Sequence, residues 1–327
     1  MAITGGREVN VGIGIETTPG TPVAAAFYPQ FTDLSMQAVS EKLTFEGARG
    51  VRNRVSNSII RRRMSRGSVA TALDPVTAAL LFRLALGSIA SATASGETIV
   101  YEHTISVQNA NATMKTFTML IERGGVVTER FSNCAINALN LECSDGFAMI
   151  TADIVGGFPD TGTVTETYTK PTLFAYSNMT VKFGTSITNA LAAAATKVKG
   201  MTLNIDNAIQ EDEAFLSGSD QPQAWVNGPL TVTGSYTIQF SDTTELNKYK
   251  ANTKHAAVIS FTGAAIGTAE FEEVSIRLGR LVLTDPPIEN DLDGVITLTQ
   301  NFTVEYDSTD LDIRVIVTNL SNGATFA

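Results

Sequence analysis

The sequence predicts an all-β protein of two tandem β-sandwich or barrel domains, each with a short flanking α-helix. Many short segments alternate apolar and polar residues, which is the period of a half-buried strand. Only two segments have a helical pattern, and no alternation of strands with helices suggests a parallel sheet. The length of 327 residues leaves room for about two domains.

A repeated stretch predicts the duplication. Phe131–Leu141 returns in outline as Phe271–Leu281, at a shift of 140 positions (271 − 131). An Asp-Gly pair follows each copy, Asp145-Gly146 and Asp293-Gly294, and is expected to supply the positive φ angles of a tight hairpin turn. The same order of elements in both halves is typical of tandem copies of one domain.

The helices follow a second repeated signal. Gly67-Ser68 opens a strand, after which Asp74-Pro75 caps a helical pattern to Leu86. Gly234-Ser235 opens the matching strand, and a helix is expected over about Thr243–Ala251.

The first half begins with residues 1–30, where glycines and prolines leave little room for a regular element, so an extended arm is expected. Its expected strands are 34–45, 68–73, 101–107, 116–122, 126–131, 134–143 and 147–155.

Three glycines and a proline in Gly156–Gly162 mark the boundary between domains 1–160 and 161–327. The second half should contain strands at 179–183, 198–205, 230–240, 256–261, 274–283, 294–306 and 313–317.

The composition favours surfaces that become covered in an assembly. Apolar residues make up 43% of the chain and charged residues only 17%, below the roughly 25% usual for soluble domains. The net charge is −10, with −1 in residues 1–160 (13 basic, 14 acidic) and −9 in residues 161–327 (10 basic, 19 acidic). An acidic chain is not expected to be a general nucleic-acid binder, because such binding depends on Lys and Arg.

Cysteine usage and hydropathy suggest a reducing compartment and no membrane insertion. Cys134 and Cys143 are expected to be buried free thiols. The longest apolar run, Val76–Leu86, is far shorter than the ~20 residues of a membrane span. The first residues lack the pattern of a secretory signal, so export by that route is not expected.

Residues for chemistry are few, so neither catalysis nor a metal or cofactor is expected. His103 and His255 both fall in expected strands, where a structural role is far commoner than a functional one. The acidic segment Asp285–Gly294 does not have the ligand spacing of a calcium loop, and a solvated turn explains it better.

Two segments of opposite charge are the candidate interaction sites. Each lies in an expected excursion, 46–66 or 207–229. The basic residues are Arg49, Arg52, Arg54, Arg61, Arg62, Arg63 and Arg66, and the acidic residues are Glu211, Asp212, Glu213 and Asp220. A solvated loop, a DNA-binding loop and complementary parts of a protein interface all fit this pattern. The absence of stacking aromatics around the arginines favours the protein interface, between different chains.

The opening Gly12-Ile-Gly-Ile-Glu-Thr-Thr-Pro-Gly-Thr-Pro22, followed by the Gly-Ser strand, the capped helix and the Asp-Gly hairpin, resembles the major tail tube proteins of long, non-contractile-tailed bacteriophages. The resemblance covers essentially the whole chain. It implies β-sandwich domains whose inner sheets join those of neighbours into a barrel around a DNA-carrying channel, in rings that stack through a long loop and terminal arms.

The resemblance also implies partners and location. The chain would assemble with itself, and two domains per chain imply a ring of three chains that mimics six subunits. Tape measure, tail terminator and baseplate proteins would be further partners. The protein would reside in the virion tail, after assembly in the host cytoplasm. DNA would pass without specific binding, through a channel whose wall should be polar or acidic, because a basic wall would retain phosphates.

An adhesin-like or carbohydrate-binding β-sandwich on a virion or cell surface is the alternative. Such sites usually present exposed aromatic platforms, yet Trp225 is the only tryptophan and aromatic residues total 7%. Long, weakly charged strands also favour a closed ring, because ring closure pairs sheet edges that would otherwise be exposed.

Overall fold

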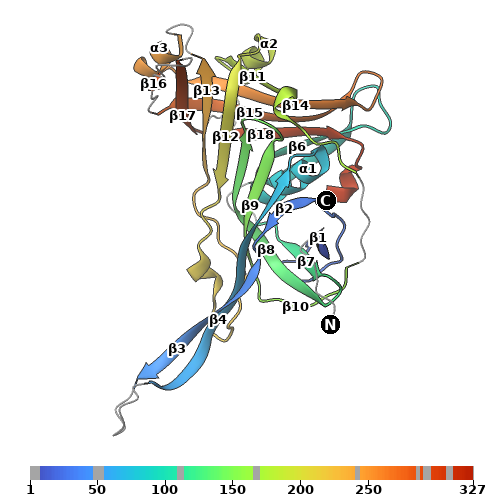
Figure 1. The fold of residues 1–327 in the computed structure, drawn as a ribbon, viewed down its shortest axis with the longest axis vertical. Helices are drawn as coiled ribbons and strands as arrows, with labels where there is room; N and C mark the ends of the chain where they lie inside the picture. The colour runs from blue at the N-terminus through green and yellow to red at the C-terminus, as the bar shows by residue number, and fades with distance from the viewer. Residues whose placement is uncertain are drawn as a thin grey trace.

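The computed structural model describes residues 8–46, 55–108, 114–164, 170–239, 244–284, 288–289, 296–306 and 312–326. It has the all-β fold that the sequence predicts (Figure 1). The helices are α1 (Pro75–Leu86), α2 (Ile187–Ala192) and α3 (Thr244–Lys250). The strands are β1 (Val9–Ile15), β2 (Phe31–Leu34), β3 (Gln37–Glu46), β4 (Val55–Ala72), β5 (Gly87–Thr93), β6 (Tyr101–Val107), β7 (Phe117–Arg123), β8 (Val127–Cys143), β9 (Met149–Gly156), β10 (Asp160–Thr161), β11 (Met179–Gly184), β12 (Val198–Asp206), β13 (Thr231–Gln239), β14 (His255–Ala265), β15 (Phe271–Leu283), β16 (Ile288–Glu289), β17 (Thr297–Val304) and β18 (Ile313–Asn319).

Strands of both halves pair with one another in two antiparallel layers. The first layer, here called the long sheet, runs β3–β4–β9–β8–β12–β13–β17, with β2 also paired with β4 and with β16 and the end of β15 paired with the other edge of β17. The pairing of β8 with β12 joins the first half to the second. The second layer runs β5–β6–β18–β15–β14–β11 and is joined across the halves by β6 and β18. The strands β1 and β7 extend the amino-terminal part of β8.

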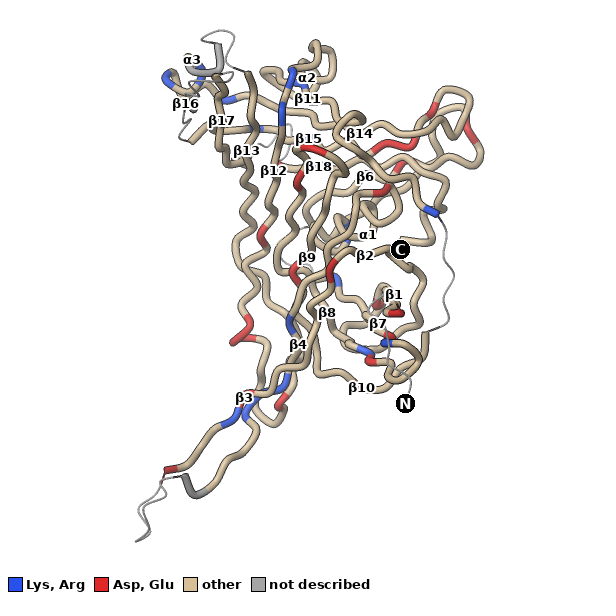
Figure 2. Tube along the Cα trace, in the orientation of Figure 1, with Lys and Arg blue, Asp and Glu red and all other residues tan. Residues whose placement is uncertain are grey.

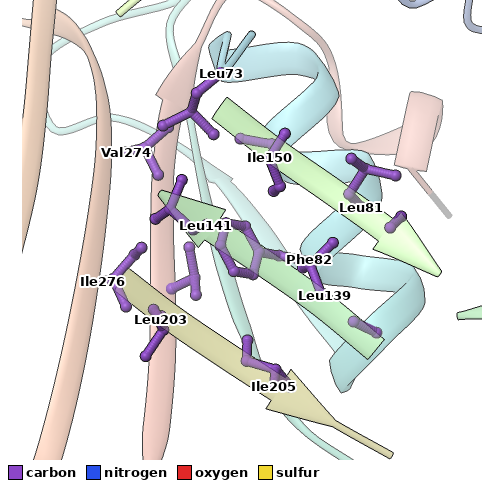
Figure 3. Close-up of a cluster of buried hydrophobic side chains, with 14 of the residues drawn as sticks. Leu73, Leu81, Phe82, Leu139, Leu141, Ile150, Leu203, Ile205, Val274 and Ile276 are labelled. Atoms are coloured by element: carbon purple, nitrogen blue, oxygen red, sulfur yellow. The ribbon is translucent and has the colours of Figure 1, made fainter. Parts of the chain in front are cut away.

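The core lies between these layers and α1 (Figure 3). Phe82 of the helix packs with Leu139 of β8, Leu203 of β12 and Ile276 of β15, and all four side chains are buried. The helix begins where the sequence predicts, because the Asp74 carboxylate accepts hydrogen bonds from the backbone amides of the first turn. It ends at Gly87, whose positive φ of 93° closes the last turn.

One irregularity of strand pairing recurs at a spacing of 167 residues. The register of β2 against β4 skips the residue after Phe31, and that of β12 against β13 skips the residue after Val198. Phe31 and Val198 are 167 positions apart (198 − 31), and their partners Thr71 and Ile238 are also 167 positions apart (238 − 71). The two strand pairs therefore share both their register and their β-bulge.

The next strand continues this correspondence. Gly67 of β4 lies opposite Ile154 of β9, and Gly234 of β13 lies opposite Phe302 of β17. The glycines are again 167 positions apart (234 − 67), and their partners are 148 apart (302 − 154). The Gly-Ser signal in the sequence thus occupies the same register position in both halves.

The shift of 140 residues expected for the following strand is wrong by seven. Leu141 of β8 pairs with Ile150, and Ile288 of β16 pairs with Leu298. The two pairs correspond at shifts of 147 (288 − 141) and 148 (298 − 150), so the counterpart of Leu141 is Ile288 and not Leu281. Alternating apolar residues match one another at many offsets, which leaves the sequence of a short strand with little information on register.

The arm expected at residues 1–30 contains a strand. Val9–Ile15 forms β1 and pairs with all seven residues of β7. Gly12 and Gly14 suggested an irregular segment, but they are the residues that let the side chain of Ala25 and the backbone of Ala24 lie against this strand. A Cβ at Gly14 would lie 2.3 Å from the carbonyl oxygen of Ala24.

The basic excursion expected at 46–66 is also largely strand. β4 begins at Val55, far upstream of the expected start at Ser68, and forms a long hairpin with β3 that projects from the body of the molecule (Figure 1). The polar sequence concealed this hairpin because both of its faces lie partly in solvent.

Most other expected elements are present, including α3 and the expected strands of the second half, while α2, β2, β5, β10 and β16 were not expected. The short strand β16 lies within the acidic segment 285–294, for which a solvated turn was expected. The Asp145-Gly146 turn has a positive φ of 98° at Gly146 alone, and Asp293-Gly294 lies outside the described residues. Cys134 and Cys143 are buried free thiols, as expected.

Candidate channel face and assembly surfaces

The long sheet has one apolar and one polar face. Leu139, Leu141 and Leu203 face the core, and the residues between them face outward. The outward residues form three consecutive cross-strand rows. The first row consists of Ser68, Asp153, Ala138, Asp206 and Thr231. The second row consists of Ala70, Thr151, Asn140, Asn204, Thr233 and Thr303. The third row consists of Met149, Glu142, Thr202, Ser235 and Asn301. We call these rows the polar face.

All charged residues of the polar face are acidic. Asp153, Asp206 and Glu142 lie among hydroxyl, amide and methyl-bearing side chains, and none of the three rows contains Lys or Arg. Figure 2 shows the nearest basic residues toward the ends of these strands. The polar face therefore has a negative potential, with donors and acceptors spread evenly over it.

Two carboxylates of the polar face lie close together. Ala138 pairs with Asp153 on one side and with Asp206 on the other, so the two acids flank one small residue. Partial removal from water and the neighbouring Asp206 carboxylate raise the pKa of Asp153 above its ordinary value.

The projecting hairpin carries exposed apolar residues. Leu43 and Ile59 lie directly opposite each other, and Phe45 lies two residues along β3 on the same face. Their side chains are 50%, 60% and 67% exposed, respectively. Exposed apolar residues gathered on a projecting element mark an interaction surface, which we call the hairpin face.

The arginines at the base of the hairpin meet the acidic excursion within the same chain. Arg62 forms an ion pair with Asp212, and Arg66 forms one with Glu211. Arg63 Nε lies 2.9 Å from an oxygen of Asp220. The excursion is thereby held against β4, close to a cation–π contact in which the Arg62 guanidinium lies 4.6 Å from the centre of the Phe215 ring.

The pairing of basic with acidic segments is thus seen inside one chain, whereas the sequence suggested it between chains. The Arg62 guanidinium lowers the pKa of Asp212, which keeps this exposed carboxylate ionised. Arg61 and Glu213, the other expected contact residues of the described segments, are exposed. Arg49, Arg52 and Arg54 lie outside the described residues.

Trp225 is no exposed platform. Its side chain is buried, and its indole Nε1 donates a hydrogen bond of 2.6 Å to the carbonyl oxygen of Asn133. The aromatic surface that the carbohydrate-binding alternative requires is therefore not provided by this residue.

The histidines lie in the core. His103 Nδ1 is 2.8 Å from Ser91 Oγ, and Nε2 is 3.1 Å from Asn319 Oδ1. Burial lowers the pKa of His103, which favours a neutral ring in a structural role. His255 is buried against the edge of the Phe183 ring. Within the described residues, no group of three or more His, Cys, Asp or Glu side chains could hold a metal ion, and no helix is long and apolar enough to cross a membrane.

Comparison with known proteins identifies the family. A search of curated proteins gives no match. The family model described as phage tail tube protein matches residues 6–304, which is nearly the whole chain and includes every strand of the long sheet. The match favours a structural component of the virion tail and not the adhesin-like alternative, and the chain belongs to the phage tail tube protein family.

Proposed function

We propose that this protein polymerises as stacked rings into the tube of a long, non-contractile phage tail, and that the polar face lines the channel for DNA. The observation that carries this proposal is the chemistry of that face. Three rows across six strands present carboxylates, hydroxyls and amides and no basic residue.

Such a wall suits transport of DNA without binding. DNA binds proteins mainly through phosphate contacts with Lys and Arg, which release counterions. Asp153, Asp206 and Glu142 repel phosphates instead, and the neutral hydroxyls and amides keep the wall hydrated. DNA therefore passes along the surface without being held, in a role that needs no catalysis, metal or cofactor.

Recurrence of register supports a ring of three chains. Each half supplies four strand positions to the long sheet in one order: the strand before the Gly-Ser strand, the Gly-Ser strand itself, and the two positions that follow. These are β2–β3, β4, β9 and β8 in the first half, and β12, β13, β17 and β15–β16 in the second. Two tube domains per chain, divided as 1–160 and 161–327, then give six quasi-equivalent units in a trimeric ring.

The hairpin connects neighbouring rings in this proposal. A two-stranded hairpin is only marginally stable by itself in water. Packing of the hairpin face against a second copy in the next ring would cover Leu43, Phe45 and Ile59. The ion pairs of Arg62, Arg63 and Arg66 hold the base of the hairpin.

The candidate contact residues keep a role between chains. Arg61 and Glu213 are exposed on oppositely charged segments, so they suit a contact between a basic and an acidic segment of adjacent copies. Rim charges of this kind set register and association rate more than affinity. The two ends of the tube would meet the tail terminator and the baseplate, and the channel would hold the tape measure protein during assembly.

The first test is electron microscopy of the purified protein. Rings or tubes of uniform bore are expected, and a protein that stays monomeric at all concentrations would contradict assembly. Replacement of Leu43 and Phe45 by Ser should then give rings that no longer stack. If tubes of normal length form, the hairpin face does not connect the rings.

The second test places positive charge on the polar face. Phage that carry Thr151→Lys and Thr233→Lys should assemble tails of normal length but deliver DNA less efficiently, because lysines would retain phosphates. Thr180→Lys is the matched control, since Thr180 is equally half-buried but lies in β11 of the other layer. Equal loss of infectivity with both changes would show that the polar face is not the channel wall.

A further inference from the structure

The junction between the two halves of one chain predicts the junction between two chains. This inference rests on the proposed ring. Inside the chain, six residues of β8, Ala138–Cys143, pair antiparallel with six of β12, Met201–Asp206. Leu203 lies opposite Leu141, and Thr202 lies opposite Glu142.

Each strand of this junction has a counterpart in the other half: β2–β3 corresponds to β12, and β16 corresponds to β8. The edge that β8 and β12 use to pair with each other has no partner strand in either counterpart, among the described residues. At the spacing of 167, Thr202 corresponds to Ser35 (202 − 167) and Leu203 to Met36 (203 − 167), as the shared bulge requires. At the spacing of 147, Glu142 corresponds to Glu289 (142 + 147), since both lie opposite equivalent residues of β9 and β17.

Both counterparts are sheet edges within the described residues of the single chain. Ile288 and Glu289 of β16 pair with β17 on one side only, among the strands that the structure describes. Between β2 and β3, the amide of Ser35 donates a hydrogen bond of 3.0 Å to the carbonyl oxygen of Ser68 in β4. The β2–β3 segment therefore pairs with β4 on one edge, and its opposite edge has no partner strand in the described part of the chain. Arg123 Nη2 makes only a long contact of 3.5 Å with the Met36 carbonyl there.

We propose that the β2–β3 edge of one chain adds to the β16 edge of a second copy, antiparallel, with Ser35 opposite Glu289 and Met36 opposite Ile288. The partner is another copy because the counterparts of these two edges, in β12 and β8, already pair with each other inside the chain. This pairing repeats the β8–β12 junction and extends the polar face from one chain to the next. It also covers backbone groups that an exposed edge would leave open to aggregation.

Disulfide trapping tests the register. The double variant Ser35→Cys, Glu289→Cys should form a bond between chains in assembled tubes, because directly opposed residues have Cβ atoms about 4.5–5.5 Å apart, close to disulfide geometry. Under oxidising, denaturing electrophoresis the single-chain band should be lost, with a closed three-chain species in its place. Cys134 and Cys143 are buried, which keeps background cross-linking low.

Two matched controls define the outcome. Thr202→Cys with Glu142→Cys is the equivalent pair inside the chain, where opposition is observed, and it should form an intrachain bond at a comparable rate. Asp33→Cys with Glu289→Cys is displaced by two residues and should cross-link poorly. If the displaced pair is trapped in place of Ser35–Glu289, the proposed register is wrong.

Failure of this inference is distinguishable from failure of the proposed function. Normal tubes by microscopy, together with trapping of the Thr202–Glu142 pair but not of Ser35–Glu289, would overturn the register and leave the tube role intact. Absence of tubes from the unmodified protein would instead count against the proposed function. If the double variant does not fold, a reconstruction of the unmodified tube decides whether Met36 lies opposite Ile288.

Discussion

Gly67 and Gly234 occupy one structural position in two strand pairs. A Cβ on Gly67 would lie 2.4 Å from the Cα of Met36, and a Cβ on Gly234 would lie 2.3 Å from the carbonyl oxygen of Thr202. Each glycine faces the backbone of the adjacent hairpin strand, where no side chain fits. The recurrent Gly-Ser sequence thus reflects a steric requirement where β4 and β13 lie against the backbone of their neighbouring strand.

Alanine at either glycine should destabilise the monomer. We expect Gly67→Ala and Gly234→Ala each to lower the free energy of unfolding by about 1–3 kcal/mol, as overpacking of a core does. Urea denaturation monitored by circular dichroism measures this change.

Gly200→Ala is the control for these two variants. It would place a Cβ 3.2 Å from the Cβ of Ser144, a contact that a small shift relieves. If Gly200→Ala destabilises the chain as much as the other two, the close backbone approach is not the reason for the repeated glycines.

A buried carboxylate should also be sensitive to conservative replacement. Glu16 is 3% exposed, and its oxygens accept hydrogen bonds from the hydroxyls of Thr116 and Thr118 and from the amides of Gly20 and Asn133, all at 2.8–2.9 Å. Glu16→Gln replaces one acceptor oxygen by a donor that faces other donors. The expected loss is about 1–3 kcal/mol of unfolding free energy.

Chemical denaturation of Glu16→Gln checks this expectation, with Glu8→Gln, an exposed residue at the start of the described chain, as control. Equal effects of both changes would mean that the hydrogen bonds of Glu16 do not stabilise the fold.

The sequence was informative where local chemistry determines structure. Asp74-Pro75 located the start of α1, and strict alternation located β6 to the residue, because capping and burial act within a few positions. It was misleading where distant contacts decide. Gly12 and Gly14 lie in a strand because β1 pairs with β7, and they are glycine because Ala24 and Ala25 lie against them. Nothing within β1 reveals these neighbours.

The candidate sites show the same limit. The charges of Arg62 and Asp212 suggested a contact, yet 150 positions separate them, and only folding showed that one chain brings them together. The polar face was not assigned to strands from the sequence, because Asp153, Ala138 and Asp206 become neighbours only through the pairing of three strands. Register is determined by partners that the sequence of a single strand does not specify.

The pH dependence of stability should reveal the pair Asp153 and Asp206. The folded-state pKa of Asp153 is raised, so the folded protein binds a proton there more tightly than the unfolded chain does. This contribution is favourable below the ordinary pKa near 3.8 and is lost as pH rises through the folded value. Asn cannot ionise, so Asp153→Asn removes this loss, and the stability of the variant relative to the parent should increase as the pH rises from 3.5 to 7.

Denaturation midpoints of parent and variant across this range provide the measurement. Asp206→Asn should lower the pKa of Asp153 toward its ordinary value in an NMR titration, because it removes the neighbouring charge. A pKa of Asp153 that does not respond to Asp206→Asn would mean that the two carboxylates do not interact.

The ion pairs at the hairpin base should control local order more than global stability. Arg66 and Glu211 are both partly solvent-exposed, so their pair contributes only ~0–1 kcal/mol to folding. Arg66→Glu should therefore leave the unfolding midpoint nearly unchanged. It should increase amide hydrogen exchange in Glu211–Ala214, because like charges then face each other and the excursion no longer docks on β4.

The double variant Arg66→Glu, Glu211→Arg should restore protection. Arg130→Glu, which breaks an exposed pair with Asp160 elsewhere, is the control and should leave exchange in this segment unchanged. If exchange at residues 211–214 is the same in the parent and in Arg66→Glu, then the excursion is held by Trp225 and its apolar neighbours alone, and the opposite charges serve another contact.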